Sequence, residues 1–279
     1  MKIGAIIQAR TSSTRLPGKV LKELPYASGI TCLEQVIRRL KKSKKLNDII
    51  VATTKEKEDN EIINIVKKEN VKYFRGSKKD VLSRYYFAAK EYNIDIIVRI
   101  TSDCPCIDVD IMDLIIDQNL KKSADYTTNK FSNIYIRGLD VEVFKYTALE
   151  KAKISAIKDY EKEHVTPYIN RNPQIFKINI MKAPKELYAP DIRITLDTEE
   201  DYALLCAVFD YLYPKNKYFN AHDIVNLFYQ KPWLKLINNK IMQKKIFNTL
   251  EEELEEAKKI LNLQGLKRAK DFMGEYLSK

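Results

Sequence analysis

The sequence predicts an α/β fold, a doubly wound and mostly parallel sheet with a helical C-terminal extension. Short apolar runs rich in β-branched residues recur along the first hundred positions, as is typical of strands buried on both faces. Amphipathic helical patterns separate these runs, and such alternation requires parallel strands joined by right-handed crossovers. With 279 residues, 45% of them hydrophobic, the chain can bury a large core.

The first part of the chain contains four expected strands, at residues 3–7, 48–52, 71–74 and 95–100. Three helical patterns lie between them, at residues 33–40, 61–66 and 81–92. Thr31 is suited to cap the first helix, because its hydroxyl can accept a hydrogen bond from a backbone N–H of the first turn. The strict order of strand and helix carries the fold prediction.

The regular alternation weakens after residue 110. The expected elements there are helices at 111–116 and 146–159, strands at 138–144, 176–181 and 192–196, and a helix opening at Thr198. One interpretation of the strand at 176–181 is a smaller excursion from the main sheet. From about Ile241 the pattern changes to long helical segments that start near Phe247. We therefore expect a domain at 1–238 and a helical extension at 239–279, which either packs on the domain as a cap or mediates dimerisation or partner binding.

The composition favours an anionic ligand, because 49 Lys and Arg residues outnumber 38 Asp and Glu residues and give a formal net charge of +11. A lysine-rich solvated face is the alternative explanation of that excess.

The four cysteines form no Cys-x-x-Cys pair, which fits a reducing compartment. No apolar run approaches the ~20 residues that span a bilayer, so we expect a cytoplasmic protein.

Three cations stand in the loop that follows the first strand: Arg10, Arg15 and Lys19. Loops at the carboxyl ends of parallel strands are where α/β proteins bind ligands. Guanidinium groups suit phosphate oxygens, and backbone N–H groups near Ser13 and Gly18 can form an anion nest. The spacing of the P-loop motif is absent. The loop therefore predicts a polyphosphate site.

This loop resembles the signature of the cytidylyltransferase family that includes 3-deoxy-manno-octulosonate and acylneuraminate cytidylyltransferases, and most closely its spore-coat polysaccharide biosynthesis branch. The resemblance continues, in the right order, through residues 51–54, 74–77, 80–85, 99–105, 138–144, 163–168 and 193–198. The turn at 25–31 departs from the family pattern and lacks one lysine of that pattern. The resemblance implies a Rossmann-like nucleotidyltransferase sheet and a homodimer.

The implied activity is Mg²⁺-dependent transfer of CMP from CTP to an acidic sugar or phosphorylated acceptor, in surface polysaccharide or glycan biosynthesis. The implied catalytic residues are Arg10, Arg15, Lys19 and Asp103. The implied nucleotide-binding residues are Gln8, Ala9, Arg10, Ser13, Lys19, Thr53, Thr54, Arg75 and Ser77. Asp103 follows the fourth strand in a turn closed by Pro105, so its carboxylate should project from the carboxyl edge of the sheet. Asp197 is the second implied metal ligand, with a helix N-cap as its alternative role.

The acceptor would be bound by Asp140, Glu142, His164 and Arg193. Asp140 and Glu142 lie two apart on an expected strand, hence on one face, where they can orient the acceptor or contribute to the metal. His164 can contact the acceptor or satisfy a local hydrogen bond. Asp80 and Arg84 are one helical turn apart, which allows an ion pair or contacts with a ligand.

Two other functions remain open at this point. The loop would hold phosphates whatever the base, so a sugar-1-phosphate guanylyl- or uridylyltransferase is the near alternative. A non-catalytic basic protein that binds nucleic acid is the alternative from another class, although nucleic acid and membrane are not the expected partners.

Overall fold

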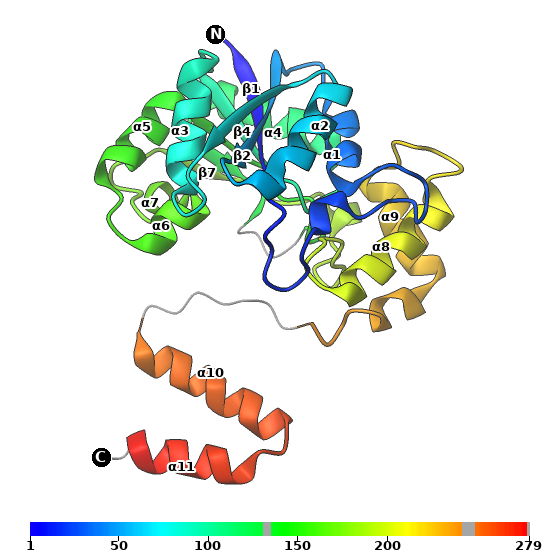
Figure 1. Ribbon diagram of the computed structural model, residues 1–279, viewed down its shortest axis with the longest axis vertical. Coiled ribbons are helices and arrows are strands. Elements are labelled where there is room, and N and C mark those ends of the chain that lie inside the picture. The colour runs from blue at the N-terminus through cyan, green and yellow to red at the C-terminus, as the bar shows by residue number, and fades with distance from the viewer. Residues whose placement is uncertain (131–134, 242–248, 278–279) are drawn as a thin grey trace. The chain divides into compact units, whose positions relative to one another are not determined.

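The computed structural model describes residues 1–130, 135–241 and 249–277 (Figure 1). The chain forms two compact units, Met1–Lys240 and Ile241–Lys279. The first unit is built around a seven-stranded sheet in the order β3-β2-β1-β4-β6-β5-β7. Helices cover both of its faces, so the doubly wound α/β prediction is confirmed.

The parallel part of the sheet consists of β1 (Ile3–Gln8), β2 (Asp48–Thr54), β3 (Lys72–Gly76) and β4 (Ile96–Thr101). The helices that connect these strands are α1 (Cys32–Leu40), α2 (Asn60–Lys68) and α3 (Val81–Glu91). Thr31 caps α1 as expected: its hydroxyl accepts from Glu34 N at 3.2 Å, and the Glu34 carboxylate accepts from Thr31 N at 2.7 Å. All three strand pairings are parallel, so the carboxyl ends of four strands meet at one edge.

The rest of the sheet is mixed. After α4 (Val109–Lys121), β5 (Tyr126–Thr128) pairs antiparallel with β6 (Glu142–Lys145), which pairs antiparallel with β4. The strand expected at 138–144 begins only at Glu142. β7 (Ile178–Ile180) pairs parallel with β5 at the edge of the same sheet, so the interpretation of this segment as an excursion is wrong.

The helix expected at 146–159 and the strand expected at 192–196 both differ from the sequence prediction. The helix expected at 146–159 stops at Ser155 as α5 (Tyr146–Ser155), and α6 (Asp159–His164) and α7 (Pro167–Asn170) follow. The strand expected at 192–196 is wrong: these residues make one bridge, between Arg193 and Arg137, and Leu196 N donates to Asp103 O at 2.8 Å. The segment thus binds to loops at the carboxyl edge of the sheet.

The first unit also contains α8 (Glu199–Leu212) and α9 (Ala221–Gln230). Its described residues include short 3₁₀ helices at Lys19–Leu21, Lys57–Asp59, Lys185–Leu187 and Pro232–Leu236. α5 and α7 pack beside α3 on one face of the sheet, whereas α1, α2, α4, α8 and α9 pack on the other (Figure 1).

The core is divided by the sheet into two layers. Ile6 packs into the layer under α3, and its neighbour Ile7 packs into the layer under α1, because successive strand residues point to opposite faces. Both side chains are fully buried, and each such burial contributes about 1.5–3 kcal/mol. This explains why β1 is apolar from Ile3 to Ile7 and does not alternate with polar residues there.

The second unit contains α10 (Leu250–Leu263) and α11 (Lys267–Leu277). Thr249 caps α10 by accepting from Glu252 N at 3.3 Å. The expected helical start at Phe247 lies outside the described residues. Across the residues described in both units, no helix has the length and apolar character needed to span a membrane.

Candidate active site

The loop after β1 is fixed to the neighbouring strand by one carboxylate. Asp59 Oδ1 accepts from Thr11 N and from Thr11 Oγ1, both at 2.8 Å. Its other oxygen accepts from the hydroxyls of Thr53 and Thr54 at the end of β2. Gly18, which adopts φ 66°, turns the loop back so that its N–H donates to Thr11 O at 2.8 Å. No sequence pattern distinguishes Asp59 from an ordinary acidic residue before a helix.

Lys19 lies between the two carboxylates expected at the carboxyl edge. Its Nζ is 2.5 Å from Asp103 Oδ2 and 2.8 Å from Asp197 Oδ1. The Lys19 side chain is only 14% exposed. Asp103 comes from the turn after β4, and Asp197 from the segment that binds to that turn. Three residues from distant parts of the sequence therefore meet in one charged cluster.

The charges of this cluster stabilise one another. Burial alone would lower the pKa of Lys19, but Asp103 and Asp197 outweigh it and raise that pKa well above its ordinary value. Burial alone would raise the pKa of Asp197, but Lys19 and then Arg15 lower it well below its ordinary value. Arg15 contributes directly, with its NH2 3.0 Å from Asp197 Oδ1. Lys19 and Asp197 are therefore both ionised at neutral pH.

Arg193 orients the Asp197 carboxylate from the side opposite Lys19. Its NH2 donates to Asp197 Oδ2 at 2.8 Å, and its Nε donates to Asp201 Oδ1 at 2.9 Å. Asp201 is fully buried and also accepts from Asn238 Nδ2 at 2.9 Å. The cap of α8 is Thr198, so the alternative role of Asp197 as an N-cap is wrong. Arg193, which the sequence analysis assigns to the acceptor, binds instead to the carboxylates of Asp197 and Asp201. No sequence pattern indicates this role of Asp201.

A second polar network links Gln8 to the segment that contains His164. Arg99 donates to Gln8 Oε1 at 2.9 Å and, through NH1, to the Glu142 carboxylate. Glu142 Oε1 also accepts from the hydroxyls of Tyr126 and Thr166, each at 2.6 Å. Burial would raise the pKa of Glu142, but the positive charges of Lys130 and Arg99 lower it to about 2.

The segment held by this network carries a backbone outlier. Val165, between His164 at the end of α6 and Thr166, has φ 71°, a conformation that β-branched residues rarely adopt. The hydroxyl of Thr166 fixes the segment on Glu142.

Asp140 precedes β6 and does not share a strand face with Glu142, so the prediction that the two acids lie on one face of a strand is wrong. Burial raises the pKa of Asp140.

The polar residues at the ends of β2 and β3 hold these ends together. Arg75 uses all three nitrogens, donating at 2.8 Å each to Thr54 O, Glu56 O and Asn60 Oδ1. Ser77 Oγ accepts from Asp80 N at 3.0 Å. In the same region Ala9 N donates to Ala52 O at 3.2 Å, and Ser13 N donates to Thr11 O at 2.8 Å. The Arg75 side chain therefore holds the backbone after β2 in place by hydrogen bonds.

Of the two roles that the sequence allows for Asp80 and Arg84, the ion pair between them does not form. Asp80 Oδ1 accepts from Ser83 N at 2.8 Å as the cap of α3, and its Oδ2 lies 3.2 Å from Lys153 Nζ. Arg84 is buried, and two of its nitrogens have no hydrogen-bond partner among the described residues. Contact with a ligand is the interpretation of Arg84 that stays open.

The metal-binding potential of the site rests on two carboxylates. Among the residues that the structure describes, no group of three or more His, Cys, Asp and Glu side chains is arranged to hold a metal ion. Cys104 and Cys106 flank Pro105 in full burial, which raises the pKa of Cys106 to about 12, so these thiols are inert. Asp103 and Asp197 are the donor set.

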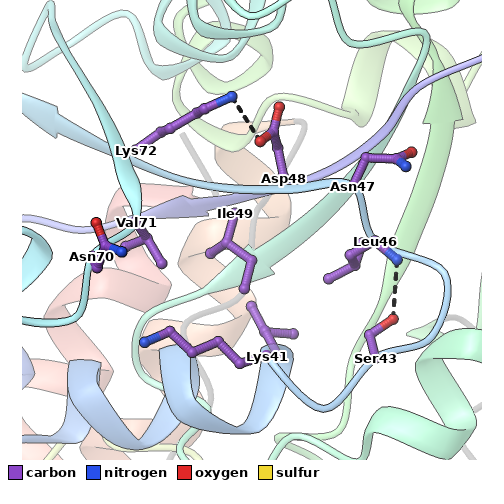
Figure 2. A pocket seen from close by; sticks show the side chains of 10 residues that line it. Lys41, Ser43, Leu46, Asn47, Asp48, Ile49, Asn70, Val71 and Lys72 are labelled. Atoms are coloured by element: carbon purple, nitrogen blue, oxygen red, sulfur yellow. Dashed lines mark hydrogen bonds and ion pairs between the residues drawn. The ribbon is translucent and has the colours of Figure 1, made fainter.

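A surface cavity of about 440 Å³ lies at the opposite edge of the sheet, around the start of β2 (Figure 2). Figure 2 shows Lys72 pointing at Asp48, where Lys72 Nζ is 2.7 Å from Asp48 Oδ1. Leu46 N donates to Ser43 Oγ at 3.2 Å on another wall. Ligand sites of parallel sheets lie at the carboxyl ends of the strands, so this cavity at the other edge is not the active-site candidate.

Two relatives and one solved structure are similar in sequence to this chain over most of its length. An uncharacterised protein of Methanocaldococcus jannaschii is 45% identical over 245 residues, 88% of this chain and 97% of the relative. The spore coat polysaccharide biosynthesis protein SpsF of Bacillus subtilis is 34% identical over 206 residues, 73% of this chain and 85% of the relative. The structure of a cytidylyltransferase from Leptospira borgpetersenii is 40% identical, covers 88% of this chain and 100% of its own, and superposes with a TM-score of 0.78.

More distant structures share the fold. A CMP:2-keto-3-deoxy-manno-octonic acid synthetase complexed with CTP is 14% identical with a TM-score of 0.56, covering 77% of this chain and 100% of its own. Rv0371c of Mycobacterium tuberculosis, in a complex with manganese, is 13% identical with a TM-score of 0.52, covering 74% of this chain and 99% of its own. The family model described as cytidylyltransferase matches residues 4–224. The chain therefore belongs to the cytidylyltransferase family and is a nucleotidyltransferase.

Proposed function

We propose that the protein is a Mg²⁺-dependent enzyme that transfers CMP from CTP to an acidic sugar or a phosphorylated acceptor and releases pyrophosphate. The observation that carries this proposal is the convergence of Lys19 on Asp103 and Asp197 beside the cationic loop after β1. The name of the Bacillus relative supports a role in surface polysaccharide or glycan biosynthesis.

The two carboxylates fit a magnesium ion. Mg²⁺ takes oxygen ligands, and one or two carboxylates suffice when phosphate oxygens and waters complete its shell. Asp103 and Asp197 each direct an oxygen at the Lys19 ammonium, so they already accommodate a positive charge between them. Bound there, the ion would neutralise phosphate charge and polarise the phosphoryl group.

The chain's own residues supply positioning and charge. An oxygen of the acceptor attacks the α-phosphorus of CTP, the bond from that phosphorus to the bridging oxygen breaks, and the electron pair leaves with pyrophosphate. Arg10, Arg15 and Lys19 are proposed to stabilise the charge that develops on pyrophosphate. A hydroxyl acceptor must also lose a proton, whereas a phosphate acceptor needs no base.

The acceptor is proposed to lie near the network of Gln8, Arg99 and Glu142. This network joins the end of β1 to the segment of His164. His164 and Asp140 are the proposed acceptor contacts, whereas Glu142 and Arg193 are proposed to act by holding other groups in place. Thr53, Thr54, Arg75 and Ser77 are proposed to shape the base pocket through the backbone that they support.

The test is pyrophosphate release with Mg²⁺, each of the four nucleoside triphosphates, and a panel of nonulosonic acids and sugar phosphates. We expect the largest signal with CTP. A larger signal with GTP or UTP and a sugar 1-phosphate would favour a guanylyl- or uridylyltransferase. No release from any triphosphate, together with binding of single-stranded nucleic acid, would overturn the enzymatic proposal.

The protein is further proposed to act as a cytoplasmic homodimer on small soluble substrates. The family resemblance supports the dimer, and the reducing-compartment cysteine pattern supports the location. Light scattering coupled to size exclusion tests the oligomeric state: we expect twice the chain mass of 32.6 kDa, and a mass equal to one chain would contradict the dimer.

A further inference from the structure

Arg84 is a buried cation that forms no ion pair with any residue in the described part of the chain. It lies in the first turns of α3 and is 2% exposed. Its Nε and NH1 atoms are inaccessible to solvent and have no hydrogen-bond partner within residues 1–130, 135–241 and 249–277. A buried charge is costly unless it is paired, so such a group calls for a binding partner.

The carboxylates close to Arg84 are occupied elsewhere. Asp80 caps α3 through Ser83 and pairs with Lys153. Asp59 accepts from Thr11 and from the hydroxyls at the end of β2. In the described part of the chain, neither carboxylate forms an ion pair with Arg84. Both are held by other donors, so the charge of the Arg84 guanidinium is not paired by them.

The surroundings of Arg84 are built to admit its side chain. A Cβ atom added at Gly76, the last residue of β3, would lie 2.7 Å from Arg84 Cγ. That distance is too short for a real contact, so only glycine leaves room for the arginine side chain at this strand end. Any side chain at position 76 would displace Arg84.

A second guanidinium is close. Arg10 precedes Thr11, which Asp59 joins to Thr54 at the end of β2. Thr54 pairs with Gly76, against which the Arg84 side chain packs, so both arginines come from the same end of the strands. Burial lowers the pKa of Arg84, and the positive charge of Arg10 acts in the same direction. Arg10 belongs to the loop after β1, and it too forms no ion pair with a described carboxylate. Lys19 and Arg15, by contrast, are already paired with Asp197. Two guanidinium groups at this edge, neither of them in an ion pair with a carboxylate that the structure describes, favour the binding of an oxyanion.

We propose that Arg84, together with Arg10, binds a phosphate group of the nucleotide substrate. This inference rests on the proposed function and adds a phosphate-binding residue from α3, outside the loop that carries the other cations. The two guanidinium forks match phosphate oxygens, and the bound phosphate pairs both charges at once.

The experiment is calorimetric binding of inorganic pyrophosphate, CMP and cytidine to the wild type, to Arg84→Met and to the control Arg38→Met. Arg38 is also a helical arginine, but it pairs with Glu34 and Glu69. We expect Arg84→Met to weaken binding of pyrophosphate, CMP or both by about tenfold or more, and to leave cytidine binding unchanged. A loss for CMP would identify the α-phosphate, whereas a loss for pyrophosphate alone would identify the departing phosphates.

A melting curve separates this function from a structural role. Because Arg84→Met removes an unpaired buried charge, the ligand-free variant should melt at the wild-type temperature or above it. A clearly lower melting temperature of both Arg84→Met and Arg84→Gln would contradict the inference. Wild-type affinity of Arg84→Met for all three ligands, or an equal loss for cytidine, would also overturn it.

The outcomes distinguish this inference from the proposed function. A wild-type protein that releases pyrophosphate from CTP, with unchanged affinities in Arg84→Met, would refute only the role of Arg84. A wild-type protein that binds pyrophosphate through Arg84 but transfers no nucleotide would refute only the proposed function. A wild type that binds neither pyrophosphate nor CMP would refute both.

Discussion

Lys19 and Asp197 are 178 positions apart in the chain, and the Lys19 ammonium lies 2.8 Å from an Asp197 carboxylate oxygen. The same ammonium is 2.5 Å from Asp103. A cation of the protein therefore occupies the point at which the two proposed metal ligands meet. If Asp103 and Asp197 hold a divalent ion, Lys19 and that ion compete for the same oxygens.

Lys19→Met should separate metal binding from turnover. We expect the variant to bind Mn²⁺ more tightly than the wild type, by about tenfold, because a competing positive charge is removed. Pyrophosphate release should fall by about 100-fold or more, because a charge that stabilises the departing phosphates is lost. Mn²⁺ titration and a turnover assay measure the two effects.

The matched control for Lys19 is Lys22→Met. Lys22 lies over the ring of Tyr202, 4.8 Å from its centroid, and so has a partner other than the two aspartates. Both Mn²⁺ affinity and turnover should stay at wild-type values in this control. Weaker Mn²⁺ binding by Lys19→Met would show that Lys19 does not compete with the metal.

Glu142 should make the fold sensitive to acid. Its pKa is about 2 in the folded protein and ~4.3 in an unfolded chain. A lowered folded-state pKa gives stability that is fully present above ~4.3 and is lost as the pH falls toward about 2. Urea unfolding of the wild type should therefore show a free energy of unfolding that drops between pH 5 and pH 3. Asp197, whose pKa is also lowered, contributes in the same direction.

Glu142→Gln should be less stable than the wild type at pH 7 and should lose less of its remaining stability between pH 5 and pH 3. Glu61→Gln, at an exposed position of α2, is the control and should follow the wild-type curve. Parallel pH profiles for Glu142→Gln and the wild type would rule out Glu142 as an acid-sensitive group.

Asp59→Ala should destabilise both the fold and the loop after β1. The substitution leaves Thr11 N, Thr11 Oγ1 and the two hydroxyls of Thr53 and Thr54 without their acceptor. We expect the free energy of unfolding to fall by about 2–4 kcal/mol, and pyrophosphate binding to weaken because the loop loses its anchor. Glu58→Ala, at the exposed neighbouring position, should stay within about 0.5 kcal/mol of the wild type, and a similarly small effect of Asp59→Ala would contradict the anchoring role.

The parallel half of the fold could be predicted because its signals are local. Ile6 and Ile7 enter different core layers, so β1 has to be apolar from Ile3 to Ile7. The capping box of Thr31 and Glu34 is visible in four consecutive residues of the sequence. The segment 192–196 has an apolar pattern like a strand. Its hydrogen bonds, however, go to Arg137 and Asp103, and no local pattern reveals that.

The same distinction applies to the site. The meeting of Asp103 and Asp197 followed from the family motifs and from the rule that ligands bind at the carboxyl ends of parallel strands. Asp59 and Asp201 could not be recognised, because each resembles an ordinary acid beside a helix and its role depends on distant partners. Arg75 and Glu142 lie on β3 and β6, and tertiary hydrogen bonds that no local pattern reveals make their side chains supports for neighbouring groups.

The role of Asp103 in metal-dependent transfer is tested by pyrophosphate release from CTP and an active acceptor at controlled free Mg²⁺. The assay compares the wild type, Asp103→Asn and the control Asp110→Asn, which changes an exposed acid of α4. We expect release by the wild type and by the control to rise to saturation with Mg²⁺ and to stop in EDTA, and we expect Asp103→Asn to lose about 100-fold or more in turnover at saturating metal. Equal rates for Asp103→Asn and the wild type, or release that continues undiminished in EDTA, would contradict this role.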